Sequence, residues 1–439
     1  MRRLLALLRA ERVLSHSLIV GLATLAVGLL GVAFQSVVSH RLRPANYGEV
    51  FAVLTLITFI ALPSNAFTLL MSRATSRDRA DDAHLKSAAL LHGGSRALLL
   101  IGIVCAASFA LASPLISHFF ALPLPLLLAA AGGIPFALAL PLLLGEFQGQ
   151  QRFVSFSLLA ASQAALRLLG ALALGFFYGP VGVVAGVSLG SAVIFAVAWW
   201  MLRRKLSVKA TVPWLRPAAA YLALILPSTL ALGLLLSTDV LVVKHFFSSR
   251  QAGEYAAVAA MGRGIFWGAM GVSGVLFSKV VFRETQGRSG LPLITAALAL
   301  VVVGGLGGLA LLSAGSTWLL TAFSGPAYAE AAPYVPWYAI GMTLLGASAV
   351  LIATQQSRGK PAFLAVLLPF TLLEPVLLTA FHENLMQVVQ VLDIAMGLLL
   401  AGLAIQFVLQ QRVVRSAGDY PKAAVASTPP AAPRVNVGR

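Results

Sequence analysis

The chain has 439 residues, of which 59% are hydrophobic and only 10% are charged, and its formal net charge is +17. A soluble domain would carry roughly a quarter charged residues, so this composition excludes an ordinary soluble globular protein. Apolar runs of about 20 residues recur from Ser15 almost to the C-terminus, and each is long enough to cross a bilayer as a helix. The runs are continuous rather than alternating in polarity, which favours helices over a β-barrel.

The chain starts with a basic segment, residues 1–14, that we predict to be an amphipathic cytoplasmic extension. The apolar run after it is too long for a signal-peptide core and lacks a small-x-small cleavage site, so it predicts a retained first helix. The sequence predicts an all-α integral membrane protein with about 12 transmembrane helices. In chain order these helices cover residues 15–39, 49–71, 87–112, 121–144, 155–177, 181–202, 218–243, 255–278, 290–313, 334–356, 362–381 and 387–410.

The predicted helices form two lobes of six, an N-lobe over residues 15–205 and a C-lobe over 206–411. Residues 412–439 are rich in Pro, Ala and Ser and predict a disordered cytoplasmic tail. Most of the 31 lysines and arginines fall on the side that holds both termini. The positive-inside rule therefore places both termini in the cytoplasm, and it explains the basic composition without a nucleic-acid partner.

An internal similarity supports the division into lobes. VVSHRLRPANYGEVFAV, from Val37, and VVKHFFSSRQAGEYAAV, from Val242, share identical residues at an offset of 205, including the pairs His40/His245, Gly48/Gly253 and Glu49/Glu254. An even number of helices lies between the two copies, so the lobes are parallel and related by a pseudo-two-fold axis along the membrane normal. Within each copy we expect the glycine to permit a tight turn and the glutamate to lie in the first turn of the next helix.

Seven ionisable residues fall within the predicted spans, where charges are costly and usually face a protein interior or a watery cavity. Three deep arginines predict a cationic cavity for an anion such as a phosphate, because the guanidinium fork donates two parallel hydrogen bonds. The acids are candidates for ion coupling, and the alternative is that acids and arginines pair internally. A lysine close to the outer surface is within reach of water by snorkelling. The predicted cavity residues are Arg263, Arg167, Arg96 and Lys244, and the acids are Asp239, Glu374 and Asp393.

Other classes of site have little support in the sequence. No Walker lysine loop, HExxH pair or GxSxG elbow occurs, so we expect no enzyme activity and no cofactor. The single cysteine, Cys105, lies in an apolar run, forms no intramolecular disulfide and supports no cysteine metal site.

Three short segments resemble a known family. RLRPANYGEV after the first helix is similar to the L-x-P-x-x-Y/F-G loop of polysaccharide-type flippases, STDVLVVKHFFSSRQAGEYAAV resembles their seventh-helix stretch, and LLGEFQGQQRF resembles their loop after helix 4. These segments resemble the Wzx-like polysaccharide transport branch of the multidrug/oligosaccharidyl-lipid/polysaccharide exporter superfamily. The first helix lacks the acidic residue of the drug-exporting branch, and the chain has about 12 rather than the 14 spans of the lipid II flippase branch.

The resemblance implies movement of an undecaprenyl-pyrophosphate-linked oligosaccharide across a bacterial inner membrane by alternating access, with membrane lipid and a glycan polymerase or chain-length regulator as partners. Two alternatives remain open. One is a non-transporting scaffold in a glycan polymerase complex, against which the deep arginines argue. The other is a major-facilitator carrier, which also has parallel halves but usually carries a glycine between helices 2 and 3 that SRATSRDRADDAHLK lacks.

Overall fold

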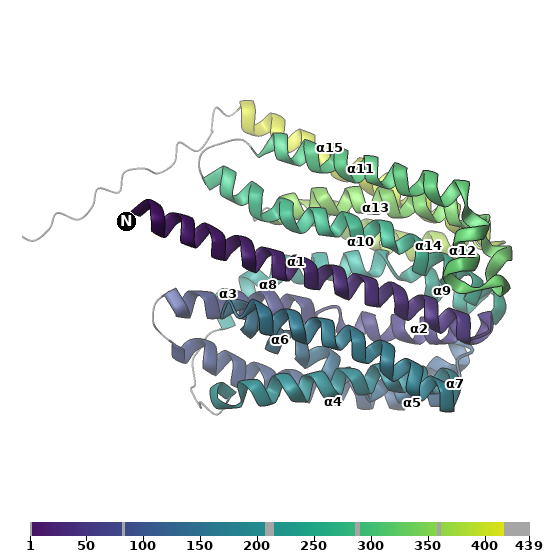
Figure 1. Ribbon diagram of the computed structural model, residues 1–439. Helices are drawn as coiled ribbons and strands as arrows, with labels where there is room; N and C mark the ends of the chain where they lie inside the picture. The colour runs from purple at the N-terminus through teal and green to yellow at the C-terminus, as the bar shows by residue number, and fades with distance from the viewer. Residues whose placement is uncertain (1, 81–83, 207–214, 286–289, 358–360, 417–439) are drawn as a thin grey trace, which may run out of the picture.

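The computed structural model describes residues 2–80, 84–206, 215–285, 290–357 and 361–416, and within these ranges every regular element is helical (Figure 1). The N-lobe contains α1 Arg2–Arg41, α2 Pro44–Ala61, α3 Ser64–Ala80, α4 His84–Phe120, α5 Leu124–Ala131, α6 Ile134–Gly149 and α7 Phe153–Leu206. The C-lobe contains α8 Leu215–Leu235, α9 Thr238–Phe246, α10 Ser249–Thr285, α11 Leu291–Ala314, α12 Ser316–Ser324, η1 Pro326–Ala331, α13 Tyr334–Ser357, η2 Pro361–Phe363, α14 Leu364–Ala380 and α15 Leu385–Ser416.

The helices cross the bundle in the predicted order. Ten described helical stretches are long and apolar enough to span a bilayer, and one of them, α7, is 54 residues long. This helix folds back on itself at Gly179, whose φ of 58° is readily adopted only by glycine. A Cβ added to Gly186 would lie 2.2 Å from the carbonyl carbon of Gly170, so the two legs of the hairpin pack backbone to backbone. With α7 as two passes and α10 as a further one, the fold has the twelve predicted passes.

Three predicted spans are broken rather than continuous. In the second span, α2 ends at Ala61 and α3 begins at Ser64, because Pro63 cannot continue the helical hydrogen-bond pattern. The fourth divides into α5 and α6 at the Gly132–Gly133 pair, and the seventh divides into α8 and α9 between Leu235 and Thr238. The last of these breaks places a helix N-terminus inside the C-lobe.

The two ends of the chain differ in part from the expected domains. The first helix, α1, begins at Arg2 rather than near residue 15, so residues 2–14 extend the first span as one continuous helix. The side chains of this extension lie outside the described residues, as does its predicted amphipathic character. At the other end α15 continues to Ser416, and most of the predicted tail, residues 417–439, lies outside the described residues.

The lobes lie side by side: in Figure 1 most N-lobe helices are drawn below the green-to-yellow C-lobe helices, while purple α1 and teal α8 lie between them. Their main described contact is between α2 and α10, where the two equivalent glycines of the internal repeat meet. A Cβ on Gly48 would lie 2.7 Å from the backbone nitrogen of Gly253, and a Cβ on Gly253 would lie 1.7 Å from the carbonyl oxygen of Pro44. The repeat therefore marks the pseudo-two-fold contact between the lobes.

This contact corrects the expected role of the repeat. Because α2 begins at Pro44 and α10 at Ser249, Gly48 and Gly253 lie inside helices and form no turn. Neither helix has an acidic residue in its first turn, so Glu49 and Glu254 do not cap helices as predicted. Instead, Glu254 accepts a hydrogen bond from the Nε of Arg250 at 2.8 Å.

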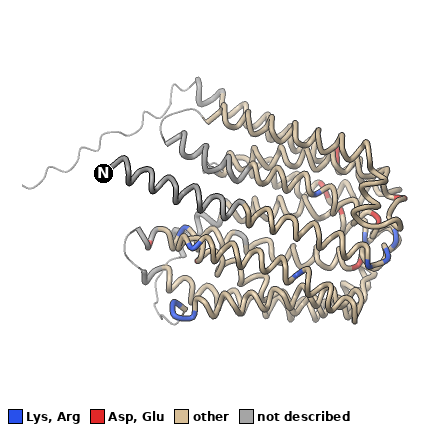
Figure 2. The backbone as a smooth tube through the Cα atoms, viewed as in Figure 1, with Lys and Arg blue, Asp and Glu red and all other residues tan. Residues whose placement is uncertain are grey.

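Charged residues gather at the two ends of the bundle, and few lie in its middle (Figure 2). This distribution is typical of a membrane-spanning protein, because the ends meet water and headgroups while the middle meets hydrocarbon. The few charges inside the bundle belong to the candidate site.

Candidate functional site

Arg167 lies midway along the first leg of α7, where it faces α1. Its guanidinium carbon is 4.1 Å from the centre of the Phe34 ring, a cation–π contact that is strongest when water is excluded. The Nε atom is buried without a hydrogen-bond partner, and no ion pair is recorded for this arginine within the described residues. The N-lobe therefore holds a buried cation that has no ion-pair partner among the described residues.

An aromatic row on α1 and α2 connects Arg167 with Arg263. The Tyr47 ring is 5.8 Å from the Phe51 ring, and the Tyr47 hydroxyl donates to Oε1 of Gln35 at 3.0 Å. The Arg263 guanidinium lies 5.3 Å from the Phe51 ring, and Tyr47 is an electrostatic neighbour of both arginines. Phe34, Tyr47 and Phe51 are called the row of rings below. Arg167 of the N-lobe lies over Phe34 and Arg263 of the C-lobe lies near Phe51.

Arg263 forms an ion pair with a residue of its own lobe, Asp239. Its Nη2 donates to Oδ1 of Asp239 at 3.1 Å, and its Nε donates to the Tyr338 hydroxyl at 3.3 Å. Oδ2 of Asp239 accepts hydrogen bonds from Tyr255 at 3.0 Å and Tyr338 at 2.9 Å. The predicted alternative of internal pairing therefore describes this pair, whereas Arg167 has no ion pair within the described part of the chain.

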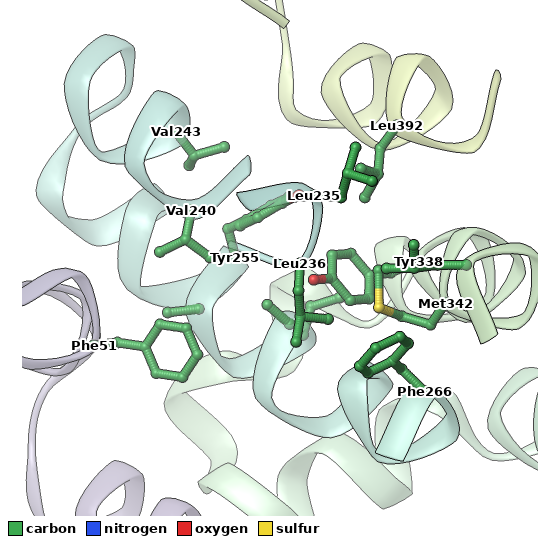
Figure 3. Close-up of a cluster of buried hydrophobic side chains, with 14 of the residues drawn as sticks. Phe51, Leu235, Leu236, Val240, Val243, Tyr255, Phe266, Tyr338, Met342 and Leu392 are labelled. Carbon is green, nitrogen blue, oxygen red and sulfur yellow. The ribbon is translucent and has the colours of Figure 1, made fainter. Parts of the chain in front are cut away.

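The helix break in the seventh span also stabilises the negative charge of the Asp239 carboxylate. Asp239 lies in the first turn of α9, directly after the interruption between Leu235 and Thr238. A helix N-terminus carries partial positive charge, which stabilises a carboxylate there. Figure 3 shows Tyr255 and Tyr338 among the buried side chains of this region, together with Leu235, Leu236 and Phe266. Neither tyrosine was predicted as a site residue, because a buried tyrosine in a span also has an ordinary packing role.

Glu374 of α14, unlike Asp239, accepts no hydrogen bond from the described residues. Its side chain is fully buried, with 0% exposure, and neither carboxylate oxygen has a hydrogen-bond partner among the described residues. Asp239 and Arg263 are its electrostatic neighbours. Asp393 of α15 is half-buried and lies against the backbone of Gly341, where an added Cβ would be 2.6 Å from Oδ1. Glu374 is thus close to Asp239, but the described residues contain no group of three acids, histidines or cysteines arranged to hold a metal ion.

The other two predicted cavity residues lie elsewhere. Lys244 is only 3% exposed, so it does not snorkel to water, and its Nζ donates to the Ser249 hydroxyl at 3.0 Å. Glu49 of the N-lobe is its electrostatic neighbour, which places Lys244 at the contact between the lobes.

Arg96 is exposed on the same side of α4 as Leu100 and Ile103, one and two turns further along. This side chain lies on an apolar outer surface of the N-lobe, and α4 packs mainly against α3, α5 and α6 rather than α1 or α2. The structure therefore does not bring Arg96 together with the row of aromatic rings.

A second buried charge network was not predicted. Glu146, in the last turn of α6, is fully buried, and its Oε1 accepts a hydrogen bond from Lys205 Nζ at 2.5 Å. Its Oε2 accepts from the Thr75 hydroxyl at 2.5 Å, and Lys205 also donates to the Ser87 hydroxyl at 2.8 Å. These contacts connect the ends of four N-lobe helices, α3, α4, α6 and α7, on one side of the bundle. The prediction missed them because the predicted fourth span ended at residue 144, which left Glu146 in a loop.

No protein-family model matches the sequence, and no curated protein is significantly similar to it. Solved structures are similar in fold. A multidrug resistance MATE family transporter of the MOP superfamily, in an inward-facing conformation, matches with a TM-score of 0.73 and 13% identity over 90% of this chain and 96% of that chain. The lipid II flippase MurJ, in an inward closed conformation, matches with a TM-score of 0.68 and 14% identity over 89% of this chain and 87% of that chain.

A third structure, the MATE multidrug transporter DinF-BH, matches with a TM-score of 0.67 and 17% identity over 91% of this chain and 95% of that chain. At such identities the likeness concerns the fold and not the substrate. This chain has the two-lobed, all-helical membrane fold that MATE and MurJ structures share.

Proposed function

We propose that the chain moves an undecaprenyl-pyrophosphate-linked oligosaccharide across a bacterial inner membrane by alternating access. The observation that carries the proposal is Arg167, a deep cation that has an aromatic face but no recorded ion pair among the described residues. Leaving an arginine uncompensated in a span costs several kcal/mol on low-end scales, so a visiting anion is a physical reason for its presence. A pyrophosphate suits the guanidinium fork.

The two-lobed fold supports alternating access as the route. In transporters built from parallel repeats, the lobes rock about a site near the midplane. The described lobes meet through Gly48 and Gly253, and the row of rings between Arg167 and Arg263 extends inward from this contact. In this proposal Arg167 receives the pyrophosphate first, and Arg263 joins it when the lobes move and its pair with Asp239 loosens.

The C-lobe acids supply a candidate coupling site. A buried carboxylate without hydrogen-bond donors is costly to keep charged, so Glu374 is suited to bind a proton when the site is closed. Release of that proton would place a second negative charge near Asp239 and compete for Arg263. Asp393, on the neighbouring α15, is the next candidate in the same lobe.

The test is the leaflet accessibility of a labelled polyprenyl-pyrophosphate oligosaccharide in proteoliposomes. We expect the Arg167→Gln variant to flip the lipid at least about tenfold more slowly than the wild type, because a charge-assisted hydrogen bond contributes about 1.5–3 kcal/mol. Arg203→Gln is the matched control, since Arg203 also stacks on a ring, that of Trp200 at 5.1 Å, but is exposed at the inner end of α7. Equal rates for Arg167→Gln and wild type would refute the cationic site.

The second candidate is a membrane scaffold in a glycan polymerase complex. It would be favoured if the wild type flipped no labelled lipid while a co-expressed polymerase bound it tightly. The similarity to MATE and MurJ structures gives no support to the major-facilitator alternative.

A further inference from the structure

The outer ends of α1 and the α7 hairpin enclose a cavity of about 260 Å³. Its walls are almost entirely apolar, with Val37 and Leu42 from α1 and Leu172, Phe176 and Val183 from α7. The one charged side chain in the lining is Arg41, in the last turn of α1. Arg41 is exposed, and no ion pair is recorded for it within the described part of the chain.

Exposed aromatic rings show the depth of this cavity in the membrane. Phe176, Phe177 and Tyr178 at the tip of the hairpin are 72%, 74% and 69% exposed. Of these, Tyr178 is of the type that gathers with Trp where hydrocarbon meets headgroups, so we place the hairpin tip at the outer headgroup level. Because Arg41 and Phe176 line one cavity close to Tyr178, this placement puts the guanidinium near the lipid phosphates and the apolar walls toward the hydrocarbon.

The charge pattern is unusual at this point of the sequence. External segments of the protein are poor in basic residues, as the positive-inside rule requires, yet Arg41 and Arg43 both follow the first helix on the outer side. A positive charge that opposes the topology rule and has no ion pair among the described residues suggests a local anionic partner.

The equivalent position in the C-lobe is built differently. An offset of 205 pairs Arg41 with Phe246, the last residue of α9. The Phe246 ring lies 3.8 Å from the ring of His382, so an aromatic pair occupies the place that in the N-lobe is an open cavity with a cation. The pseudo-symmetric fold therefore does not require an arginine or a cavity here.

We propose that the α1–α7 cavity binds an anionic phospholipid of the outer leaflet, with its phosphate on Arg41 and part of one acyl chain between α1 and α7. The charge-assisted contact favours a headgroup with a net negative charge over a zwitterionic one, in which choline offsets the phosphate, and burial of methylene groups in the groove holds the chain. This site is separate from the site around Arg167 and does not depend on what the protein transports.

The experiment is native mass spectrometry of the purified full chain, titrated with phosphatidylglycerol or phosphatidylcholine. Wild type should bind phosphatidylglycerol more tightly than phosphatidylcholine. Arg41→Gln should weaken phosphatidylglycerol binding about tenfold and phosphatidylcholine binding less, because both lipids carry a phosphate but only phosphatidylglycerol has a net charge. Arg43→Gln is the matched control, because Arg43 is also exposed but does not line the cavity, and it should bind both lipids as wild type does.

A second variant tests the groove itself. Leu172→Trp, which fills it, should reduce the binding of both lipids, and thermal unfolding in detergent checks that both cavity variants remain folded. The proposal is overturned if Arg41→Gln binds phosphatidylglycerol as tightly as wild type does, or if Arg43→Gln weakens that binding as much as Arg41→Gln does. It is also overturned if the folded Leu172→Trp protein binds both lipids as wild type does.

Discussion

Glu146 in the N-lobe and Glu374 in the C-lobe are both glutamates with 0% exposure in apolar helices. Glu146 accepts hydrogen bonds from Lys205, Thr75 and Gln150, so its charge is fully compensated. Neither oxygen of Glu374 has a hydrogen-bond partner among the described residues. The two glutamates are therefore equally buried but differ in their hydrogen-bond partners. The free energy of a buried charge depends on these partners rather than on its depth.

The comparison extends to the lobes that hold the two glutamates. The contacts of Glu146 tie helix ends together and favour an N-lobe that moves as one body. Around Glu374, the C-lobe has Asp239 and Arg263, whose charges respond to any change in protonation nearby. We therefore expect mutations near Glu146 to reduce stability and mutations near Glu374 to alter transport.

The largest effect is expected for Lys205→Ala, which leaves the Glu146 carboxylate buried without its cation. Breaking one side of a buried ion pair costs about 3–5 kcal/mol. Thermal unfolding in detergent should show a large loss of stability. The double variant Lys205→Met/Glu146→Gln removes both charges and should recover most of the lost stability. A double variant as unstable as the single one would show that packing, not charge, is responsible.

The contact between the lobes provides the next test. In Gly253→Ala the new methyl group would collide with the backbone carbonyl of Pro44, which cannot move as a flexible side chain could. Overpacking of this kind costs about 1–3 kcal/mol and should hold α2 and α10 apart where the lobes meet. Distances between spin labels on α2 and α10 should lengthen. Gly264→Ala on the same helix meets open space and should leave these distances unchanged.

A smaller loss is expected for Tyr338→Phe. The variant removes one donor to Asp239 and the acceptor for Nε of Arg263, while Asp239 retains Tyr255, Arg263 and the N-terminus of α9. Loss of these two hydrogen bonds costs about 2 kcal/mol, measured by thermal unfolding. A loss as large as that of Lys205→Ala would contradict the view that several donors share the stabilisation of Asp239.

The smallest change in stability is expected for Glu374→Gln, within about 1 kcal/mol of wild type, because no hydrogen bond within the described residues is lost. Its effect should instead appear in transport. If Glu374 carries a proton, an imposed pH gradient should accelerate lipid movement by wild type but not by the variant. An unchanged response to the gradient would remove Glu374 from the coupling site.

The amino-acid sequence determined the membrane class, the number and order of the passes, the two lobes and the pair of repeated segments. Each of these follows from local chemistry: a helix in hydrocarbon must satisfy its own backbone and present apolar side chains, so hydropathy alone reveals it. The resemblance of RLRPANYGEV and its repeat to a flippase family agrees with the fold but leaves the substrate a proposal.

Tertiary structure decided which charges are partners. The sequence places Arg167, Arg263 and Arg96 at similar depths, yet one lies over Phe34, one binds Asp239 and one is exposed on α4. Hydropathy records how deep a residue lies but not which way it faces, and the partner of a buried charge comes from another helix distant in sequence. The roles of Gly48 and Gly253 escaped prediction for the same reason, since a close approach between helices becomes visible only when both lobes are folded.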